Sequence, residues 1–172
     1  MTRLYTIGHG TSTASEFEHR CRVAGVELVV DVRSAPGSRR HPHFNRSEME
    51  RWLPAAGIAY VWESPLGGFR RPRPDSPNVG LRHPAFRGYA DHMQTDEFRD
   101  ALDTVLARAA DMPTAVMCSE TLWWRCHRRL LADAAVLLHD SDVQHIDARG
   151  PTEPHQLTAI ARRAGDVLVY AP

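Results

Sequence analysis

The chain has 172 residues, no net formal charge and a hydrophobic content of 42%, values typical of one soluble globular domain of ordinary size. No apolar run approaches the roughly 18 residues needed to span a bilayer, and no long apolar region of a signal peptide follows Met1. We therefore expect a single cytoplasmic domain over residues 1–172 with no membrane partner, and not a protein that coats nucleic acid through its overall charge.

Strand and helix patterns alternate along the first part of the chain. Residues 4–7 predict a strand, and 13–16 have the capping-box spacing that begins a helix. A second strand is expected at 27–30, a helix after the cap at 45–48, and a third strand at 58–62. A long Pro- and Arg-rich stretch then begins at residue 66 and reaches to about residue 92. Loops of that length usually act as lids or contain short helices.

The alternation continues to the end of the chain. Thr95 caps a helix with an apolar stripe, and 114–117 predicts a buried strand. The remaining expected elements are a helix from about 124 to 138, a strand at 143–147, a last helix carrying Leu157, Ile160, Ala161 and Ala164, and an edge strand at 167–170. Strands separated by helices imply right-handed crossovers. We predict a single α/β domain with three layers, in which a mostly parallel sheet carries helices on both faces.

Polar residues and glycines follow the predicted strands. Because the carboxyl ends of parallel strands meet at one edge of a sheet, where open α/β folds bind ligands, these groups should converge. They are Gly8 and His9 after the first strand, Asp31 and Arg33 after the second, Gly67 and Gly68 beyond the third, and Cys118 and Glu120 after the fourth, with Cys126, His127 and Arg128 at the start of the following helix.

Cys118 is the preferred nucleophile, because a strand-end thiol facing a helix N-terminus and arginines has a lowered pKa. Glu120 or His127 would act as general acid or base. Cys126 is either a packed residue or a resolving thiol for Cys118. Cys21 falls on the apolar face of the first helix, which favours a structural role.

Zinc is an alternative occupant of the same residues. Cys118, Cys126 and His127 would be ligands, with His9 as a fourth. Adjacent residues on a helix point about 100° apart, so coordination by both Cys126 and His127 is awkward. We therefore expect no metal or other cofactor as the first interpretation.

All 21 basic residues are arginine, which excludes chemistry that depends on lysine. An anionic small molecule, nucleotide or nucleic acid would have to be held by arginine forks, backbone amides and helix ends. Arg33, Arg39 and Arg128 are the candidate anion clamps. The sequence does not indicate an oligomeric state.

Several motifs together resemble the bacterial and archaeal family called domain of unknown function 488. They are Thr6 to His9, Asp31 to Arg33 with Pro36 and Ser38, Phe44-Asn45, Gly57-Ile58 with Tyr60, Leu66 to Gly68, the segment from Phe86 to Met93, and Met117-Cys118 and Glu120 followed by Cys126 to Arg128. This chain has Gly10 where the family often has serine. The resemblance covers residues 4 to about 149 and implies a compact α/β fold with a shared polar site, but no reaction.

Two functions are therefore expected. The first is a thiol-dependent hydrolase or transferase with Cys118 as nucleophile and an anionic substrate. The second is a non-catalytic module that binds an anionic ligand or nucleic acid in the same crevice.

Overall fold

A six-stranded sheet forms the centre of the structure, a computed structural model that describes all 172 residues. Its strand order is β3-β2-β4-β1-β5-β6, and only β6 runs antiparallel to its neighbour. The strands are β1 (Arg3–Gly8), β2 (Leu28–Asp31), β3 (Ala59–Trp62), β4 (Thr114–Cys118), β5 (Asp142–Ile146) and β6 (Thr152–Pro154).

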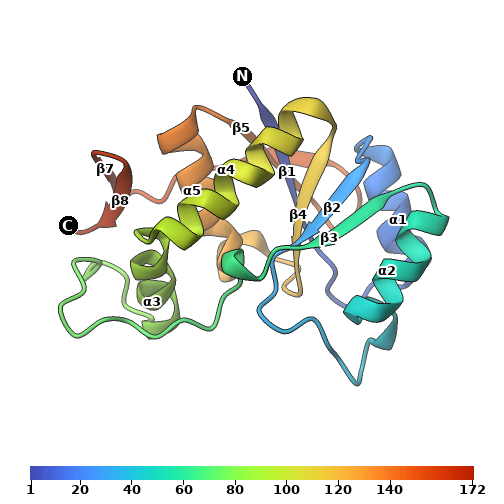
Figure 1. The fold of residues 1–172 in the computed structure, drawn as a ribbon, viewed down its shortest axis with the longest axis horizontal. Coiled ribbons are helices and arrows are strands. Elements are labelled where there is room, and N and C mark those ends of the chain that lie inside the picture. Colours follow the sequence, from blue (N-terminus) through green and yellow to red (C-terminus); the bar gives the residue numbers. More distant parts are fainter.

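Helices cover both faces of this sheet (Figure 1). Helices α1 (Ala14–Val23) and α2 (Arg46–Ala55) lie on one side, and α3 (Pro84–Met93), α4 (Asp96–Asp111) and α5 (Arg128–His139) lie on the other. Three short 3-10 helices add to them, η1 (Pro42–Phe44), η2 (Ser64–Leu66) and η3 (Trp123–Arg125). The predicted α/β architecture with a mostly parallel sheet is confirmed.

The alternation of side chains along each strand supplies two apolar clusters, one for each face. Val29 and Met117 pack with α1 and α2 in a cluster of 12 buried residues. Val30 and Val116 point the other way, into a cluster of 24 buried residues with α3, α4 and α5. All of β2 and β4 is buried, which explains why these strands are continuous apolar runs.

A crevice is expected beside the carboxyl end of β4. Strands β1 and β4 are neighbours, yet the helices that follow them, α1 and α5, pack on opposite faces of the sheet. The chain therefore diverges at the ends of these two strands, which is where open sheets of this kind leave space for a ligand. Gly8 and Cys118, the last residues of β1 and β4, are paired in the register.

The predicted last helix is wrong. Residues 152–154 form β6 on the sheet edge, and β7 (Ala161–Ala164) pairs with β8 (Val167–Tyr170) in a separate two-stranded sheet. Gly165 has φ of +67°, and a Gly–Asp pair between two strands is a hairpin signal. The strand at 167–170 exists, but it packs beside α3 and α5 and does not extend the main sheet.

Two other boundaries differ from expectation. The long stretch after residue 66 contains α3, which begins at Pro84, a residue suited to the first turn of a helix. Helix α5 begins at Arg128 and not near residue 124, because residues 123–125 form η3. No helix in the structure has both the length and the apolar character required to cross a membrane.

Candidate functional site

A cavity of about 290 Å³ opens beside the carboxyl end of β4. Six of the residues expected at the site line it, namely Arg33, Gly68, Cys118, Glu120, Cys126 and His127. The other lining residues are Ser34, Ala35, Phe69, Ala85, Phe86, Tyr89, Ser119 and Arg125. The structure thus brings together residues from the turn after β2, the loop after η2, α3, the end of β4 and the segment that leads into α5.

The two thiols of this cavity lie against each other. Their sulfur atoms are 3.2 Å apart. Cys118 closes β4 and is only 2% exposed, whereas Cys126 is half-buried on the segment before α5. The eight-residue excursion from β4 through η3 therefore returns the second cysteine to the first.

Cys126 is the sulfur that the surroundings favour as a thiolate. It lies within hydrogen-bonding distance of the Cys118 thiol, of the Arg128 backbone N–H at 3.4 Å and of Arg128 Nε at 3.3 Å. The hydrogen bond from Cys118, together with the Arg128 charge, lowers the pKa of Cys126 to about 6 despite its burial. The first turn of α5 adds the positive end of its dipole.

Cys118 has the opposite tendency. Burial raises the pKa of its thiol well above the ordinary value, so Cys118 is the thiol that keeps its proton and can donate it to the Cys126 sulfur. Of the two thiols, Cys126 is therefore the one that loses its proton more readily, whereas the sequence pattern favoured Cys118. The physical reason is that Cys126 lies just before the N-terminus of α5 and accepts hydrogen bonds from Arg128.

Arg128 lies beneath the cavity and does not line it. The side chain is 1% exposed, and besides Cys126 it donates to Thr6 Oγ1 at 3.1 Å and to the carbonyl oxygens of Glu120 and Thr121 at 2.5 and 3.2 Å. These bonds leave it as a brace for the loop and a charge beside the thiolate. The expected role as an anion clamp does not match this position.

The absence of a side chain at Gly8 leaves space for the Arg128 guanidinium and the cysteine loop. A Cβ atom at Gly8 would lie 1.8 Å from the Glu120 carbonyl oxygen and 2.8 Å from an Arg128 guanidinium nitrogen. The glycine at the end of β1 is therefore required by the close approach of the cysteine loop. It supports the site without contacting the cavity.

A chain of buried hydrogen bonds continues from Arg128 across the sheet. Thr6 Oγ1 lies 2.6 Å from His145 Nδ1, His145 Nε2 lies 2.9 Å from His155 Nδ1, and His155 Nε2 lies 2.8 Å from Asp133 Oδ1. One set of proton positions satisfies every link, with each donor directed toward the Asp133 carboxylate. Burial lowers the pKa of His145 to about 2, which keeps this ring neutral.

His127 is a neutral imidazole at the cavity. Its Nε2 lies 2.9 Å from the Val32 carbonyl oxygen, so Nε2 carries the proton and Nδ1 keeps its lone pair. Burial lowers the pKa of His127 to about 4. A Cβ at Gly68 would come within 3.1 Å of Nδ1, so the glycine leaves that nitrogen accessible on the cavity side.

Glu120 and Gly67 have different positions at this edge. Glu120 is exposed, and its Oε1 accepts a hydrogen bond from the Leu122 backbone at 3.2 Å. Gly67 packs on the turn after β2, where a Cβ would lie 2.7 Å from the Ser34 backbone nitrogen. Glu120 lines the cavity, whereas Gly67 shapes the loop behind it.

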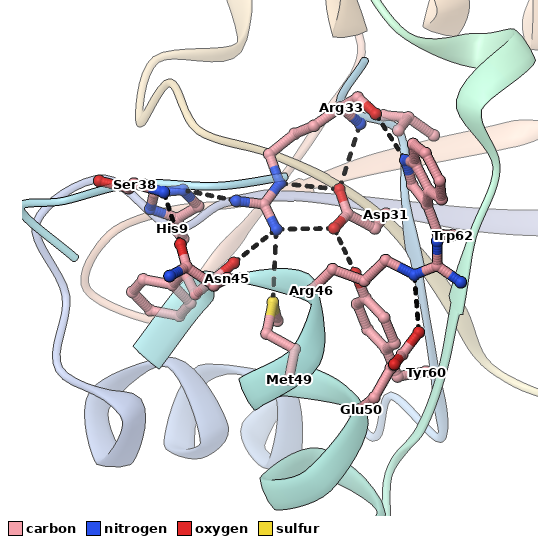
Figure 2. Close-up of polar contacts among 12 residues, drawn as sticks. His9, Asp31, Arg33, Ser38, Asn45, Arg46, Met49, Glu50, Tyr60 and Trp62 are labelled. Atoms are coloured by element: carbon pink, nitrogen blue, oxygen red, sulfur yellow. Dashed lines mark hydrogen bonds and ion pairs between the residues drawn. The ribbon is translucent and has the colours of Figure 1, made fainter. Parts of the chain in front are cut away.

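A second buried network begins at the end of β2 (Figure 2). Asp31 is fully buried and pairs with Arg33, whose Nε and NH2 donate to the carboxylate at 2.8 and 2.7 Å. Tyr60 donates to the same carboxylate at 2.5 Å. His9 meets Arg33 at 3.4 Å, stacks on Phe44, and has its pKa lowered to about 4 by burial.

These contacts account for the positions of the residues in this network and limit what each of them can bind. The charge of Arg33 is neutralised by Asp31. Arg33 also donates to the Phe44 carbonyl oxygen, so its hydrogen-bond donors are largely occupied. His9 and Asp31 do not line the cavity, and Arg39 lies exposed outside it. The structure contains no group of three or more His, Cys, Asp or Glu side chains placed to hold a metal ion. His9, the fourth ligand of the zinc alternative, contacts Arg33 instead.

The sequence patterns did not indicate several cavity residues. Phe69 is 94% exposed and has φ of +56°, an uncommon backbone for a phenylalanine. Arg125 is also exposed at the cavity, and its side chain makes no hydrogen bond or ion pair within the chain. Phe86 and Tyr89 come from α3. A phenylalanine directly after Gly67-Gly68 in an arginine-rich loop was the one available signal.

Comparison with known proteins identifies a family for most of the chain. Residues 13–135 match the family described as Domain of unknown function DUF488. No curated protein and no solved structure gave a match. The matched range includes both cysteines, His127 and Arg128, in agreement with the resemblance drawn from the motifs.

Proposed function

Because the chain belongs to the DUF488 family, whose description assigns no reaction, we propose a function from the site itself: a thiol-dependent hydrolase or transferase that acts on a small anionic substrate. Cys126 would be the nucleophile. The observation that carries the proposal is the position of the Cys126 sulfur, which lines an open cavity, accepts hydrogen bonds from the Arg128 backbone and side chain, and lies 3.2 Å from the Cys118 sulfur. A stabilised thiolate accessible to a ligand is the requirement for nucleophilic thiol chemistry.

The cavity favours a small substrate over a nucleic acid strand. Its volume of about 290 Å³ is at the lower end of the range for small-molecule sites, about 300–1,000 Å³. Arg125 is the exposed cation at this cavity, whereas the charge of Arg33 is already paired with Asp31. An anionic group would therefore bind near Arg125, with the apolar part of the substrate against Phe86 and Tyr89.

The remaining groups suit a two-step displacement. The Cys126 sulfur would attack an electrophilic carbon or phosphorus atom and expel the leaving group, forming a covalent intermediate. In a hydrolase, water would then release the bound group, and His127 Nδ1 is the free base at the cavity that can take a proton from it. Cys118 holds the attacking thiolate in place through its hydrogen bond.

The pH dependence of alkylation tests the proposal. We expect iodoacetamide to modify Cys126 in the folded protein with a midpoint below the value of about 8.5 for a free thiol, because the neighbouring thiol and Arg128 lower the pKa of Cys126. Cys126→Ser should abolish this reaction and Cys21→Ser should leave it unchanged. Activated phosphate and carboxylate esters that carry a negative charge should then give a burst of one leaving group per protein.

Two results would contradict the proposal. An alkylation midpoint near that of a free thiol would show that Cys126 is not a stabilised thiolate. Normal thiolate reactivity without any ester burst, combined with protection of Cys126 by phosphate or a nucleotide, would instead favour the non-catalytic binding module.

A further inference from the structure

We propose that Cys118 and Cys126 form a redox-active dithiol that reduces disulfides of low-molecular-weight thiols and closes a disulfide between its own two sulfurs. This inference extends the site of the proposed function, since it uses the same nucleophile, but it does not depend on an anionic substrate. The observation behind it is the pairing of two thiols from separate elements across 3.2 Å.

The two sulfurs need little movement to bond. A disulfide has an S–S length of about 2.05 Å, so the atoms must approach each other by about 1.2 Å. Cys118 ends a central strand, but Cys126 lies on the irregular segment between η3 and α5. That segment can move by this amount without a change in the sheet.

The two cysteines also differ in the way that thiol–disulfide exchange requires. Cys126 lines the cavity, where it can meet a substrate, and its neighbours stabilise the thiolate. Cys118 borders the same cavity but is only 2% exposed, and its sulfur lies 3.2 Å from that of Cys126. An accessible attacking thiolate followed by a more deeply buried resolving thiol is the order that gives two successive displacements.

Both steps balance without a further reactant. The Cys126 thiolate attacks one sulfur of a disulfide R–S–S–R, the S–S bond breaks, and RS⁻ leaves with the electron pair and takes a proton from water. Cys118 then loses its proton and attacks the Cys126 sulfur of the mixed disulfide, which expels the second RS⁻. The protein dithiol is oxidised by two electrons, and one R–S–S–R is reduced to two R–SH.

The remaining cysteine provides an internal control. Cys21 lies on α1, is fully buried, and burial raises its pKa to about 12. It packs in the cluster on the α1 and α2 side of the sheet, away from the cavity. We expect it to stay a thiol under conditions that oxidise the other two.

Oxidised glutathione added to the reduced, folded protein under anaerobic conditions tests the inference. Free thiols should fall from three to one, and peptide mapping should find a bond between Cys118 and Cys126. Cys118→Ser should stop at a glutathione adduct on Cys126, Cys126→Ser should not react, and Cys21→Ser should behave like the unchanged protein. Circular dichroism would check that each variant folds.

The products that the unchanged protein forms with oxidised glutathione test the inference even if a variant fails to fold. A stable glutathione adduct on Cys126 without the internal disulfide would overturn the dithiol, while leaving the Cys126 nucleophile and the proposed function intact. A rapid internal disulfide without any ester burst would support the dithiol and overturn the proposed hydrolase or transferase.

Discussion

At the scale of single residues, the chemistry of the site depends on which of two touching sulfurs holds the charge. Cys118 and Cys126 share one hydrogen bond, but Arg128 donates to Cys126 from both its backbone and its side chain. Burial disfavours the charge on Cys118. The two cysteines therefore differ in pKa because they differ in hydrogen-bond donors and burial.

The first prediction concerns Thr6, which orients Arg128. Thr6→Val removes the acceptor for the Arg128 guanidinium and the donor to His145. We expect the alkylation midpoint of Cys126 to rise by roughly half to one pH unit, because Arg128 is held less firmly beside the sulfur. Measurement of the alkylation rate against pH checks this. Thr6→Ser keeps the hydroxyl and should restore the midpoint; an unchanged midpoint in Thr6→Val would refute the role of Thr6.

The second prediction compares a buried with an exposed ion pair in the same region (Figure 2). Asp31 is 0% exposed opposite Arg33, whereas the side chain of Glu50 is 48% exposed opposite Arg46. Asp31→Asn should lower the free energy of unfolding by about 3–5 kcal/mol, because it leaves a buried guanidinium without its counter-charge. Glu50→Gln should cost less than about 1 kcal/mol. Urea unfolding measures both, and equal losses would contradict the argument.

At the scale of elements, the ends of β1 and β4 determine where the cysteine loop lies. The loop returns over Gly8, and its Glu120 carbonyl occupies the space that a side chain would take. The same loop places Trp123 flat against His145 at 4.2 Å between ring centres. Its path is thus defined by close packing on β1 and β5.

The third prediction follows from that packing. Gly8→Ala should displace the Glu120 carbonyl and Arg128, reduce the alkylation rate of Cys126 at pH 6.5 by about tenfold, and cost about 1–3 kcal/mol of stability. Gly37→Ala is the matched control, because a Cβ at Gly37 meets nothing within 4 Å. The interpretation fails if both variants react and unfold like the unchanged protein.

At the scale of the whole molecule, histidines whose pKa is lowered by burial make stability depend on pH, and His92 is one of them. Burial lowers the pKa of His9 and His127 to about 4 and that of His145 to about 2. Their ordinary value is near 6.5, so below that pH the unfolded chain binds protons that the folded chain does not. The full stability is present above about pH 6.5 and is lost as the pH falls toward 4.

The fourth prediction is a steep acid limit. The free energy of unfolding, measured in urea, should decrease by several kcal/mol between pH 7 and pH 4.5, a size set by about 1.4 kcal/mol per pKa unit for each histidine. His9→Gln should flatten this dependence, because it removes one of the titrating rings. A stability that stays level over this range would show that the histidines are protonated in the folded protein.

Much of the fold was predictable from local patterns. The strands of the parallel sheet and the helices α1, α2 and α4 follow from apolar periodicity and from caps such as Thr13 and Thr95. The hairpin of β7 and β8 was not recognised. Ala161 and Ala164, which begin and end β7, favour a helix locally, whereas Gly165 and packing of Tyr170 against α5 favour strands.

The sequence by itself determined that reactive groups follow the strands and that they meet at one edge of a parallel sheet, because the carboxyl ends of such strands coincide. Only the tertiary structure decided their roles. It placed Cys118 and Cys126 together at the cavity, with Cys118 the more deeply buried, and Arg128, His9 and Asp31 below the surface. Burial and the available hydrogen-bond donors decide which thiol is deprotonated more readily and which side chains support the loop, and both depend on contacts between residues far apart in the chain.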